Sequence, residues 1–311
     1  MKNKLVDVCI EILQKCPHKC IYCSSNSTPT SEPILPLDKI LEIIDFGLLH
    51  DVQNISLSGG EPMLHPDIIE IIKYLNEKCS KYYIYTSGNY SAEILELLNY
   101  CDKDKALIVF NYQSTDSDEF IKISGTDHET FCRVCDNIQA TVENKFNVEL
   151  NIVPNRINLY NLYNTIMCLQ NIGVKKVNLL RFVAQGRGLE NRRIFDIDNY
   201  FDDALGNVVQ DVRFGALTSG FVLRCGIPLG NIEDDFKHVC KAGFQKLVFN
   251  FSGNVYPCEA FKGEGEAFIL GNIYKDTLED IYRNGINHEG LKTLRQTVKN
   301  SKDYNPCVHK N

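Results

Sequence analysis

Three cysteines lie close together near the start of the sequence, and their chemistry gives the first hypothesis. Cys16, Cys20 and Cys23 are spaced C-x3-C-x2-C, and Tyr22 stands directly before the last of them. Soft thiolates select zinc, Cu(I) or iron–sulfur clusters, and zinc sites and ordinary cubane clusters take four protein ligands. The next cysteine, Cys79, is far along the chain. A cubane held by these three thiolates would therefore leave one iron open to a small molecule.

A Gly-Gly-Glu segment is the second group of residues that could do chemistry. Gly59 and Gly60 allow a ligand to come close to the backbone, and Glu61 adds a carboxylate. The alternative interpretation is a tight turn in which Glu61 caps a short helix opened by Pro62.

The hydrophobic pattern predicts the elements that position these residues. Strand and helix patterns alternate six times, which predicts a parallel sheet with helices outside. Six units are too few for an eight-unit barrel, so the expected fold is α/β, a curved and partial (β/α)6 barrel. The expected strands are 5–13, 54–58, 82–86, 106–110, 148–153 and 176–182, and the expected helices are 37–49, 68–79, 92–100, 131–143 and 159–171.

Polar residues follow several of these strands. The cysteine loop follows the first, Gly59-Gly60-Glu61 the second, Ser87 the third and Asn111 the fourth, while Arg181 ends the sixth. Ligand sites of such sheets lie at the carboxyl ends of the strands. An Arg side chain at the carboxyl end of a strand can bind a carboxylate through two hydrogen bonds.

The pattern changes beyond residue 185 and predicts a smaller α+β unit. A helix is expected over 197–212, a β-hairpin over 246–257 around Ser252-Gly253-Asn254, and two further helices over 277–284 and 291–299. We therefore expect two domains, residues 1–190 and residues 191–311.

The cysteine spacing and the Gly-Gly-Glu segment resemble the radical S-adenosylmethionine (radical SAM) superfamily. The resemblance implies that SAM chelates the open iron and that Gly59, Gly60 and Glu61 bind its methionine portion. It also implies SAM contacts for Ser87 and Asn111. The segment Tyr85-Thr86-Ser87-Gly88-Asn89 stands where many relatives have Thr-Asn-Gly, and Asn111 stands where many have Ser. Arg181 could bind a carboxylate of SAM or of a substrate.

The C-terminal unit resembles the SPASM and twitch extensions of that superfamily. Cys240 and Cys258 stand in a C-x12-G-x4-C pattern, and the resemblance implies one auxiliary 4Fe–4S cluster. With Cys225 upstream and Cys307 downstream, four thiolates would be present. Cys225 can instead be a core residue, or a reactive thiol that donates a hydrogen atom to a substrate radical.

The resemblance implies an enzyme that cleaves SAM to a 5′-deoxyadenosyl radical and takes a hydrogen atom from a substrate. We expect a ribosomally made peptide that is crosslinked or epimerised. The alternative is a dehydrogenase or epimerase of a small molecule such as an aminoglycoside. The implied partners are an electron donor such as flavodoxin or ferredoxin and, since the first strand starts near residue 5, a separate leader-binding protein. From another class, the chain could be a non-catalytic zinc-binding or cluster-binding protein.

Composition and charge limit the expected partners, the location of the protein and the roles of its cysteines. The net charge of −7 does not favour a nucleic-acid partner. No apolar run has the length of a membrane span, and no signal h-region is seen at the N-terminus, so we expect a cytoplasmic protein. Thirteen cysteines without a secretion signal argue for metal or cluster ligation. The remaining six are expected to be small buried hydrophobes, namely Cys9, Cys79, Cys101, Cys132, Cys135 and Cys168.

Overall fold

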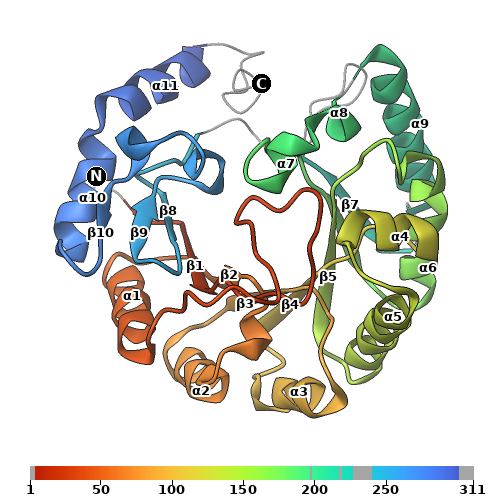
Figure 1. Ribbon diagram of the computed structural model, residues 1–311, viewed down its shortest axis with the longest axis horizontal. Coiled ribbons are helices and arrows are strands. Elements are labelled where there is room, and N and C mark those ends of the chain that lie inside the picture. Colours follow the sequence, from red (N-terminus) through yellow and green to blue (C-terminus); the bar gives the residue numbers. More distant parts are fainter. Residues whose placement is uncertain (1–3, 197, 217–218, 227–239, 301–311) are drawn as a thin grey trace.

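A single curved sheet of ten strands forms the centre of the computed structural model, in the order β10-β9-β8-β1-β2-β3-β4-β5-β6-β7. The structure describes residues 4–196, 198–216, 219–226 and 240–300. In Figure 1 the strands form the inner wall and the helices lie around the outside.

The first six strands are parallel and confirm the expected (β/α)6 pattern. They are β1 Asp7–Leu13, β2 Asn54–Gly59, β3 Tyr82–Thr86, β4 Ala106–Asn111, β5 Asn147–Ile152 and β6 Lys176–Leu179. The helices between and after them are α1 Leu37–Leu49, α2 Ile68–Lys78, α3 Ala92–Glu96, α4 Ser117–Ser124, α5 His128–Glu143 and α6 Leu162–Asn171, with short 3-10 helices η1 Pro62–Leu64, η2 Leu97–Tyr100 and η3 Leu159–Asn161.

Several of these bounds differ from the expected ones, among them the start of α5 and the end of β6. The helix expected at 131 begins at His128, because the Asp127 side chain accepts a hydrogen bond from the backbone N–H of Thr130 and caps the helix earlier. Strand β6 ends at Leu179, so Arg181 lies two residues beyond the strand.

The rest of the chain extends the same sheet at both edges. Strand β7 adds a seventh parallel strand next to β6, and β8 pairs in parallel with β1. The expected hairpin is β8 with β9, joined through Gly253. These elements are α7 Arg187–Glu190, α8 Arg192–Phe195, α9 Asn199–Ala216, β7 Val222–Cys225, β8 Lys246–Phe249, β9 Asn254–Tyr256, η4 Glu259–Phe261, η5 Glu266–Phe268, β10 Gly271–Asn272, α10 Leu278–Asn287 and α11 Glu289–Asn300. The domain boundary at residue 190 stays a prediction.

The two faces of the sheet differ in chemistry. Apolar residues such as Ile10, Leu57 and Ile84 are fully buried under the helices, whereas their neighbours along each strand, such as Glu11 and Ser56, face the inside of the curve. Successive side chains of a strand point to opposite faces. The interior of the curved sheet is therefore polar. Across the described residues, no helix is long and apolar enough to cross a membrane.

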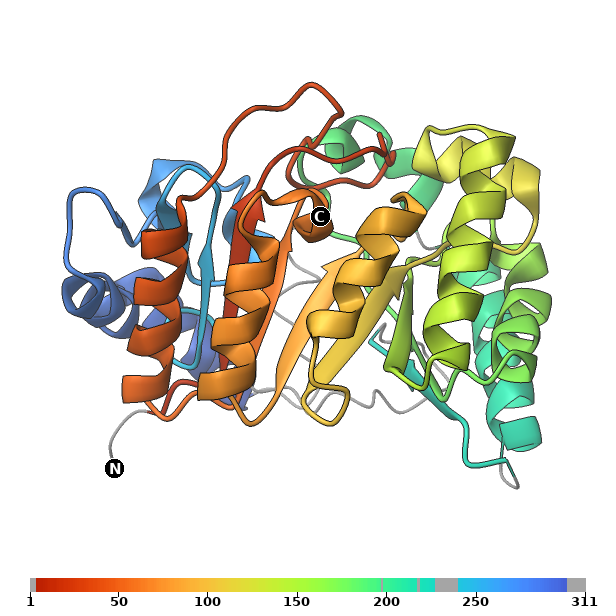
Figure 2. The ribbon, with the colours of Figure 1, turned by 90° about the horizontal axis from the view of Figure 1, so that it is seen from below.

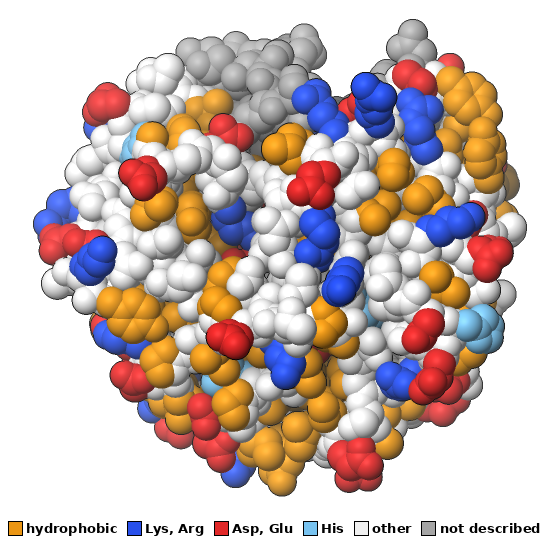
Figure 3. Space-filling view, in the orientation of Figure 1, with side chains coloured by type: hydrophobic (Ala, Val, Ile, Leu, Met, Phe, Trp, Pro, Cys, Tyr) orange, Lys and Arg blue, Asp and Glu red, His pale blue; other side chains and the backbone are white. Residues whose placement is uncertain are grey.

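The segment at residues 14–34, here called the cysteine loop, lies over the carboxyl ends of the strands. Figure 2 shows it at the top of the sheet, and Figure 1 shows it crossing the middle of the molecule. On the face drawn in Figure 3, Lys and Arg side chains gather over this loop and near α8. The exposed basic residues of these segments include Lys19, Arg192 and Arg193.

Asn137 on α5 tests whether the outer helices stabilise the loops that follow the carboxyl ends of the strands. Its side-chain amide donates to the carbonyl oxygens of Gly88 (2.8 Å) and Tyr90 (3.0 Å), just after β3. We expect Asn137→Ala to lower the free energy of unfolding by about 1–3 kcal/mol, because two buried carbonyls lose their donor. Urea unfolding followed by circular dichroism measures this. Asn144→Ala, which removes one exposed bond to Ala140, is the matched control, and equal losses in both variants would contradict the assignment.

Candidate functional site

One cavity of about 850 Å³ opens inside the curve of the sheet, under the cysteine loop. Eight of the residues singled out in the sequence line it, namely Cys16, Cys20, Cys23, Gly59, Gly60, Ser87, Asn111 and Arg181. Glu61, Cys225, Cys240 and Cys258 are not among its lining residues. Cys307 lies outside the described residues.

Backbone hydrogen bonds fix the cysteine loop to its surroundings. The N–H groups of Lys19 and Ile21 donate to the carbonyls of Ser124 and Ile123 at the end of α4, both at 2.9 Å. The N–H of Cys16 donates to the carbonyl of Thr28 within the loop at 3.1 Å. A short helix that the sequence pattern did not predict therefore supports the segment that carries the three thiols.

Arg187, at the start of α7, donates hydrogen bonds to three backbone carbonyls of the cysteine loop. Its Nε donates to the carbonyl of Cys20 (3.0 Å) and its Nη2 to the carbonyl of Ser27 (2.7 Å). Its backbone N–H donates to the carbonyl of Cys23 (3.1 Å). The guanidinium is a rigid fork of donors, so this one residue orients the backbone on both sides of Cys23.

Gly59 and Gly60 are needed because the backbones of β2 and the cysteine loop come very close together. A Cβ on Gly60 would stand 2.0 Å from the carbonyl oxygen of Lys15, and one on Gly59 would stand 2.3 Å from that of Leu13. Gly59 also has φ +120°, which favours glycine. The N–H of Gly60 donates to Leu13 at 2.7 Å and that of Glu61 to Lys15 at 2.8 Å. These bonds dock the start of the loop on the end of β2.

Glu61 is fully buried, and its carboxylate is occupied by its neighbours. It accepts hydrogen bonds from the N–H of Ser87 (2.7 Å), the hydroxyl of Ser87 (2.6 Å), the hydroxyl of Thr86 (2.9 Å) and the N–H of Met63 (3.2 Å). Burial raises the pKa of Glu61, and the bonds from Ser87, Thr86 and Met63 oppose this rise. In this arrangement the carboxylate ties the end of β2 to the end of β3 and sets the position of Ser87.

The cavity wall is lined with ion pairs. Lys262 bonds Glu11 at 2.6 Å, Lys246 bonds Glu259 at 2.7 Å, and Lys176 bonds Glu149 at 2.7 Å. All six side chains line the cavity. Sequence reasoning did not single these residues out. The signal was present, because polar residues alternate with apolar ones along the strands and the polar set must face the interior.

Cys240 and Cys258 each precede a residue that lines the cavity, Lys241 and Glu259 respectively. The N–H of Gly243 donates to the carbonyl of Pro257 at 3.1 Å, so the segments next to Cys240 and Cys258 run side by side. Both thiols are half-buried. The thiol of Cys258 donates to Glu259 at 3.3 Å.

Cys225 lies elsewhere in the fold. It is fully buried at the end of β7, and its neighbour Arg224 lines the cavity, so the two side chains lie on opposite faces of the strand. Strand β7 is one edge of the sheet, and six strands separate it from β8. Cys225 is therefore not among the residues that line the cavity, and its role as a cluster ligand stays a prediction.

The six cysteines expected to be small buried hydrophobes divide into groups. Cys9, Cys79 and Cys101 are buried and Cys135 is half-buried, but Cys132 and Cys168 are exposed. For these two the expectation is wrong, because each lies on the solvent side of its helix. Cys9 is buried and yet lines the cavity.

The donor set of the cysteine loop, three thiols that line one cavity, has the chemistry that a cubane cluster takes. Within the part of the chain that the structure describes, no three His, Cys, Asp or Glu side chains converge on one point as a mononuclear metal requires. A cubane takes one thiolate for each ligated iron, so its ligands stand apart around a shared cavity. Burial raises the pKa of Cys16 and raises that of Cys20 to about 12. These thiols are neutral until a positively charged group displaces their protons.

Glu61→Gln tests the tie between β2 and β3. A carboxamide presents one oxygen and a donor NH2 group to a set of donors, so at least one bond to Ser87 or Thr86 is lost. We expect the free energy of unfolding to fall by about 1–3 kcal/mol, measured by urea unfolding of the cluster-free chain. Glu96→Gln, at an exposed position, is the control. Equal stability of Glu61→Gln and the unsubstituted chain would refute the tie.

Arg187→Gln tests the clamp on the cysteine loop. The substitution removes the donors to Cys20 and Ser27, so we expect faster hydrogen exchange of backbone amides in residues 20–28, with little change in β3 and β4. Arg192→Gln is the matched control, since Arg192 is exposed and its side chain pairs with Asp196 at 3.5 Å. Unchanged exchange in the loop would show that Arg187 does not hold it.

Comparison with known proteins agrees with this geometry. Residues 10–157 match the model of the radical SAM superfamily, and residues 240–309 match that of the SPASM iron–sulfur cluster-binding domain. The chain is 22% identical over 290 residues to the antilisterial bacteriocin subtilosin biosynthesis protein AlbA of Bacillus subtilis, covering 90% of this chain and 60% of that protein. It is 24% identical over 284 residues to a probable GTP 3′,8-cyclase of Saccharolobus islandicus, covering 89% of this chain and 90% of that protein.

Solved structures share the fold. SuiB of Streptococcus suis bound to its precursor peptide SuiA superposes with a TM-score of 0.76 at 16% identity, covering 94% of this chain and 67% of that one. The enzyme anSMEcpe with bound AdoMet and Cp18Cys peptide superposes with a TM-score of 0.70 at 17% identity, covering 96% and 86%. The two matched family models imply three kinds of cofactor: a 4Fe–4S cluster, SAM and auxiliary iron–sulfur clusters. The chain therefore carries a radical SAM domain, matched over residues 10–157, and a SPASM iron–sulfur cluster-binding domain, matched over residues 240–309.

Proposed function

We propose that this chain is a peptide maturase, which takes a hydrogen atom from a ribosomally made peptide. The observation that carries the proposal is the shared cavity, where three thiols, the Gly59-Gly60 turn and three further polar residues line one space inside a parallel sheet. When bound, the cluster and SAM supply the electron and the 5′-deoxyadenosyl group for radical chemistry.

In this proposal Cys16, Cys20 and Cys23 hold the SAM-binding cluster. Gly59 and Gly60 present backbone groups to SAM, and Ser87, Asn111 and Arg181 are available to its polar parts because they line the same cavity. We assign Glu61 a positioning role beneath them, since its carboxylate is already occupied by Ser87, Thr86 and Met63. A direct bond from Glu61 to the ammonium of SAM stays a prediction.

For the auxiliary cluster we propose Cys240 and Cys258, with Cys307 as a third ligand. Support comes from the neighbouring backbones of Gly243 and Pro257. We favour a core position for Cys225, because its side chain is buried on the helix-facing side of β7.

The chain's own residues give the cavity two further properties. The side chain of Lys262, in the C-terminal unit, donates to Glu11 of β1 and to Ser25 of the cysteine loop. The side chain of Gln185 donates to the carbonyl of Ala260. These bonds close the cavity on the side of η4, which keeps water away from a reactive radical. The polar wall provides hydrogen-bonding groups for a peptide backbone that enters from the open side.

The names of similar proteins support a peptide. AlbA is a bacteriocin biosynthesis protein, SuiB is bound to a precursor peptide, and anSMEcpe is bound to a peptide with AdoMet. This chain spans 60% of the length of AlbA, so the activity of that whole protein is carried over here only as a proposal. An electron donor such as flavodoxin or ferredoxin, a separate leader-binding protein and a cytoplasmic location remain predictions.

A small-molecule substrate is the second candidate. The relatives named as probable GTP 3′,8-cyclases match over 90% of their own length, and the three ion pairs in the cavity wall suit a compact, polar molecule as well as a peptide.

Co-expression tests the proposal. The chain is produced together with each short reading frame that flanks its gene, and the peptides are analysed by mass spectrometry. We expect one peptide to change in mass with the unsubstituted chain and to stay unchanged with a variant in which Cys16, Cys20 and Cys23 are all replaced by Ala. A matched control replaces Cys79, Cys132 and Cys168 by Ala. Formation of 5′-deoxyadenosine from SAM without change in any peptide would favour the small-molecule substrate.

A further inference from the structure

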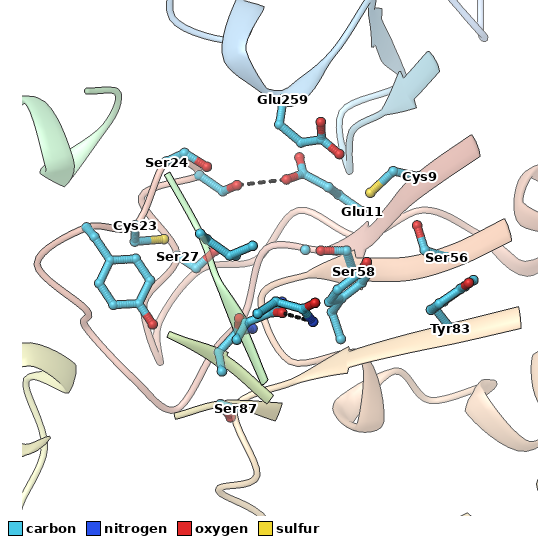
Figure 4. A pocket seen from close by; sticks show the side chains of 18 of the residues that line it. Cys9, Glu11, Cys23, Ser24, Ser27, Ser56, Ser58, Tyr83, Ser87 and Glu259 are labelled. Atoms are coloured by element: carbon cyan, nitrogen blue, oxygen red, sulfur yellow. Dashed lines mark hydrogen bonds between the residues drawn. The ribbon is translucent and has the colours of Figure 1, made fainter. Parts of the chain in front are cut away.

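A thiol that the sequence pattern assigned to the core faces the cavity. Cys9 lies in the middle of β1, with its side chain on the same face as Glu11, and both line the cavity. Its register neighbours are Ser56 on β2 and Val248 on β8. Figure 4 shows Cys9 and Glu11 on one side of the cavity, and Cys23 and Ser27 of the cysteine loop on the other.

A second observation indicates that a ligand binds next to this thiol. Glu11 is 4% exposed, and its Oε1 accepts bonds from Lys262 (2.6 Å) and Ser25 (2.8 Å). Its Oε2 is buried and has no hydrogen-bond partner among the described residues, and the same holds for the hydroxyl of Ser27. Both residues line the cavity. A buried carboxylate oxygen without a donor is unfavourable, and a ligand carrying an N–H, O–H or ammonium group would satisfy it.

The order of these groups along β1 places a ligand bound to Glu11 between the cysteine loop and the Cys9 thiol. Side chains on one face of a strand repeat every two residues, about 6.5–7 Å apart. Glu11 therefore lies one such step above Cys9 and one step below the end of the strand, where the cysteine loop begins. A ligand bound to Glu11 would have the cysteine loop on one side and the Cys9 thiol on the other.

We propose that Cys9 is a catalytic residue that returns a hydrogen atom to a carbon radical formed in this cavity, on a ligand whose N–H, O–H or ammonium group binds Glu11. The proposal rests on the proposed function, because it needs SAM cleavage. It identifies the substrate class as a molecule with a hydrogen-bond donor close to the reacting carbon, as in an amino-acid residue with its N–H next to its Cα.

The S–H bond of Cys9 breaks and a C–H bond forms at the substrate carbon, which leaves a sulfur radical on Cys9. One electron from a reduced iron–sulfur protein or cluster, with one proton from water, restores the thiol. An S–H bond and the Cα–H bond of an amino-acid residue are similar in strength, so the reduction of the sulfur radical is what makes the transfer irreversible. The hydrogen leaves one side of the carbon and returns on the other, so the net result is inversion without oxidation.

The surroundings of Cys9 keep it in the form that this step requires. Burial raises the pKa of the thiol to about 12, and the carboxylates of Glu259 and Glu11 add to the rise. The sulfur therefore carries its hydrogen at neutral pH. Cys225, the thiol that the sequence suggested for this role, is not among the residues that line the cavity.

The test uses SAM as the only added ligand. The full chain, reconstituted with iron and sulfide without oxygen, is reduced with dithionite in D₂O in the presence of SAM. The thiol of Cys9 exchanges to S–D, and with no substrate present the 5′-deoxyadenosyl radical is the carbon radical that meets it. We expect the 5′-deoxyadenosine to carry one deuterium, measured by mass spectrometry as a fraction of the product formed.

Cys9→Ala and Cys9→Ser should lower this deuterium fraction severalfold, while Cys101→Ala should leave it unchanged. Cys101 is the matched control because it is 6% exposed, against 7% for Cys9, and does not line the cavity. Iron content shows that each variant holds its clusters, and the fraction does not depend on how much enzyme is active.

Other results would overturn the proposal. An equal deuterium fraction in all four proteins would show that Cys9 is out of reach. A fraction that falls with Tyr85→Phe and not with Cys9→Ala would assign the donor to that cavity-lining phenol. If the unsubstituted chain forms no 5′-deoxyadenosine, the radical chemistry itself is absent and both this proposal and the proposed function fail. Formation of deuterated product with no peptide modified would leave Cys9 supported and the peptide substrate refuted.

Discussion

The close approach of β2 to the cysteine loop is the constraint on which the rest of the site depends. The backbone at Gly59 and Gly60 passes so near Leu13 and Lys15 that no side chain fits between them. Two backbone hydrogen bonds then align the chain on either side. Since β1 and β2 are also paired along their lengths, this contact decides where the loop leaves the sheet, and the positions of Cys16, Cys20 and Cys23 follow from it.

Around that contact, bonds from distant parts of the chain hold the loop in place. Arg187 binds the carbonyls of Cys20 and Ser27, and Lys262 binds Ser25. The loop has little regular structure of its own, and part of its fixed geometry comes from these two residues, which follow it by more than 150 positions. The shape of the candidate site is therefore a property of the whole fold and not of the cysteine motif.

The sequence predicted the parallel strands and the edge of the sheet where the chemistry gathers, because periodicity and spacing are local signals. It did not predict that β7 and β8 extend the same sheet, since strands of four residues carry too little pattern to reveal their partners. The position of Cys225 was uncertain for the same reason. The face on which it lies depends on the register of β7 against β6, and a shift of one residue would reverse it.

The interior of the sheet was predictable in principle. Alternation along β1 and β2 assigns Cys9, Glu11 and Ser56 to one face, yet the sequence alone does not say whether that face meets solvent or encloses a cavity. Three-dimensional closure decides this, through the ion pair between Lys262 and Glu11. The role given to Glu61 changed in a similar way, because its partners Thr86 and Ser87 belong to a strand whose distance from it cannot be read from the sequence.

The pairing of β1 with β8 has a consequence for how the protein comes into existence. Strand β1 leaves the ribosome long before β8 (Lys246–Phe249), which is one of its two neighbours in the sheet. Until those residues are made, one edge of β1 has no partner, and an unpaired strand edge is a template for aggregation. Contacts between residues so far apart in sequence also form slowly. A nascent chain would thus hold the three cysteines of its loop in a half-closed sheet for most of its synthesis, so assembly of the cavity is a late event that the last third of the chain controls.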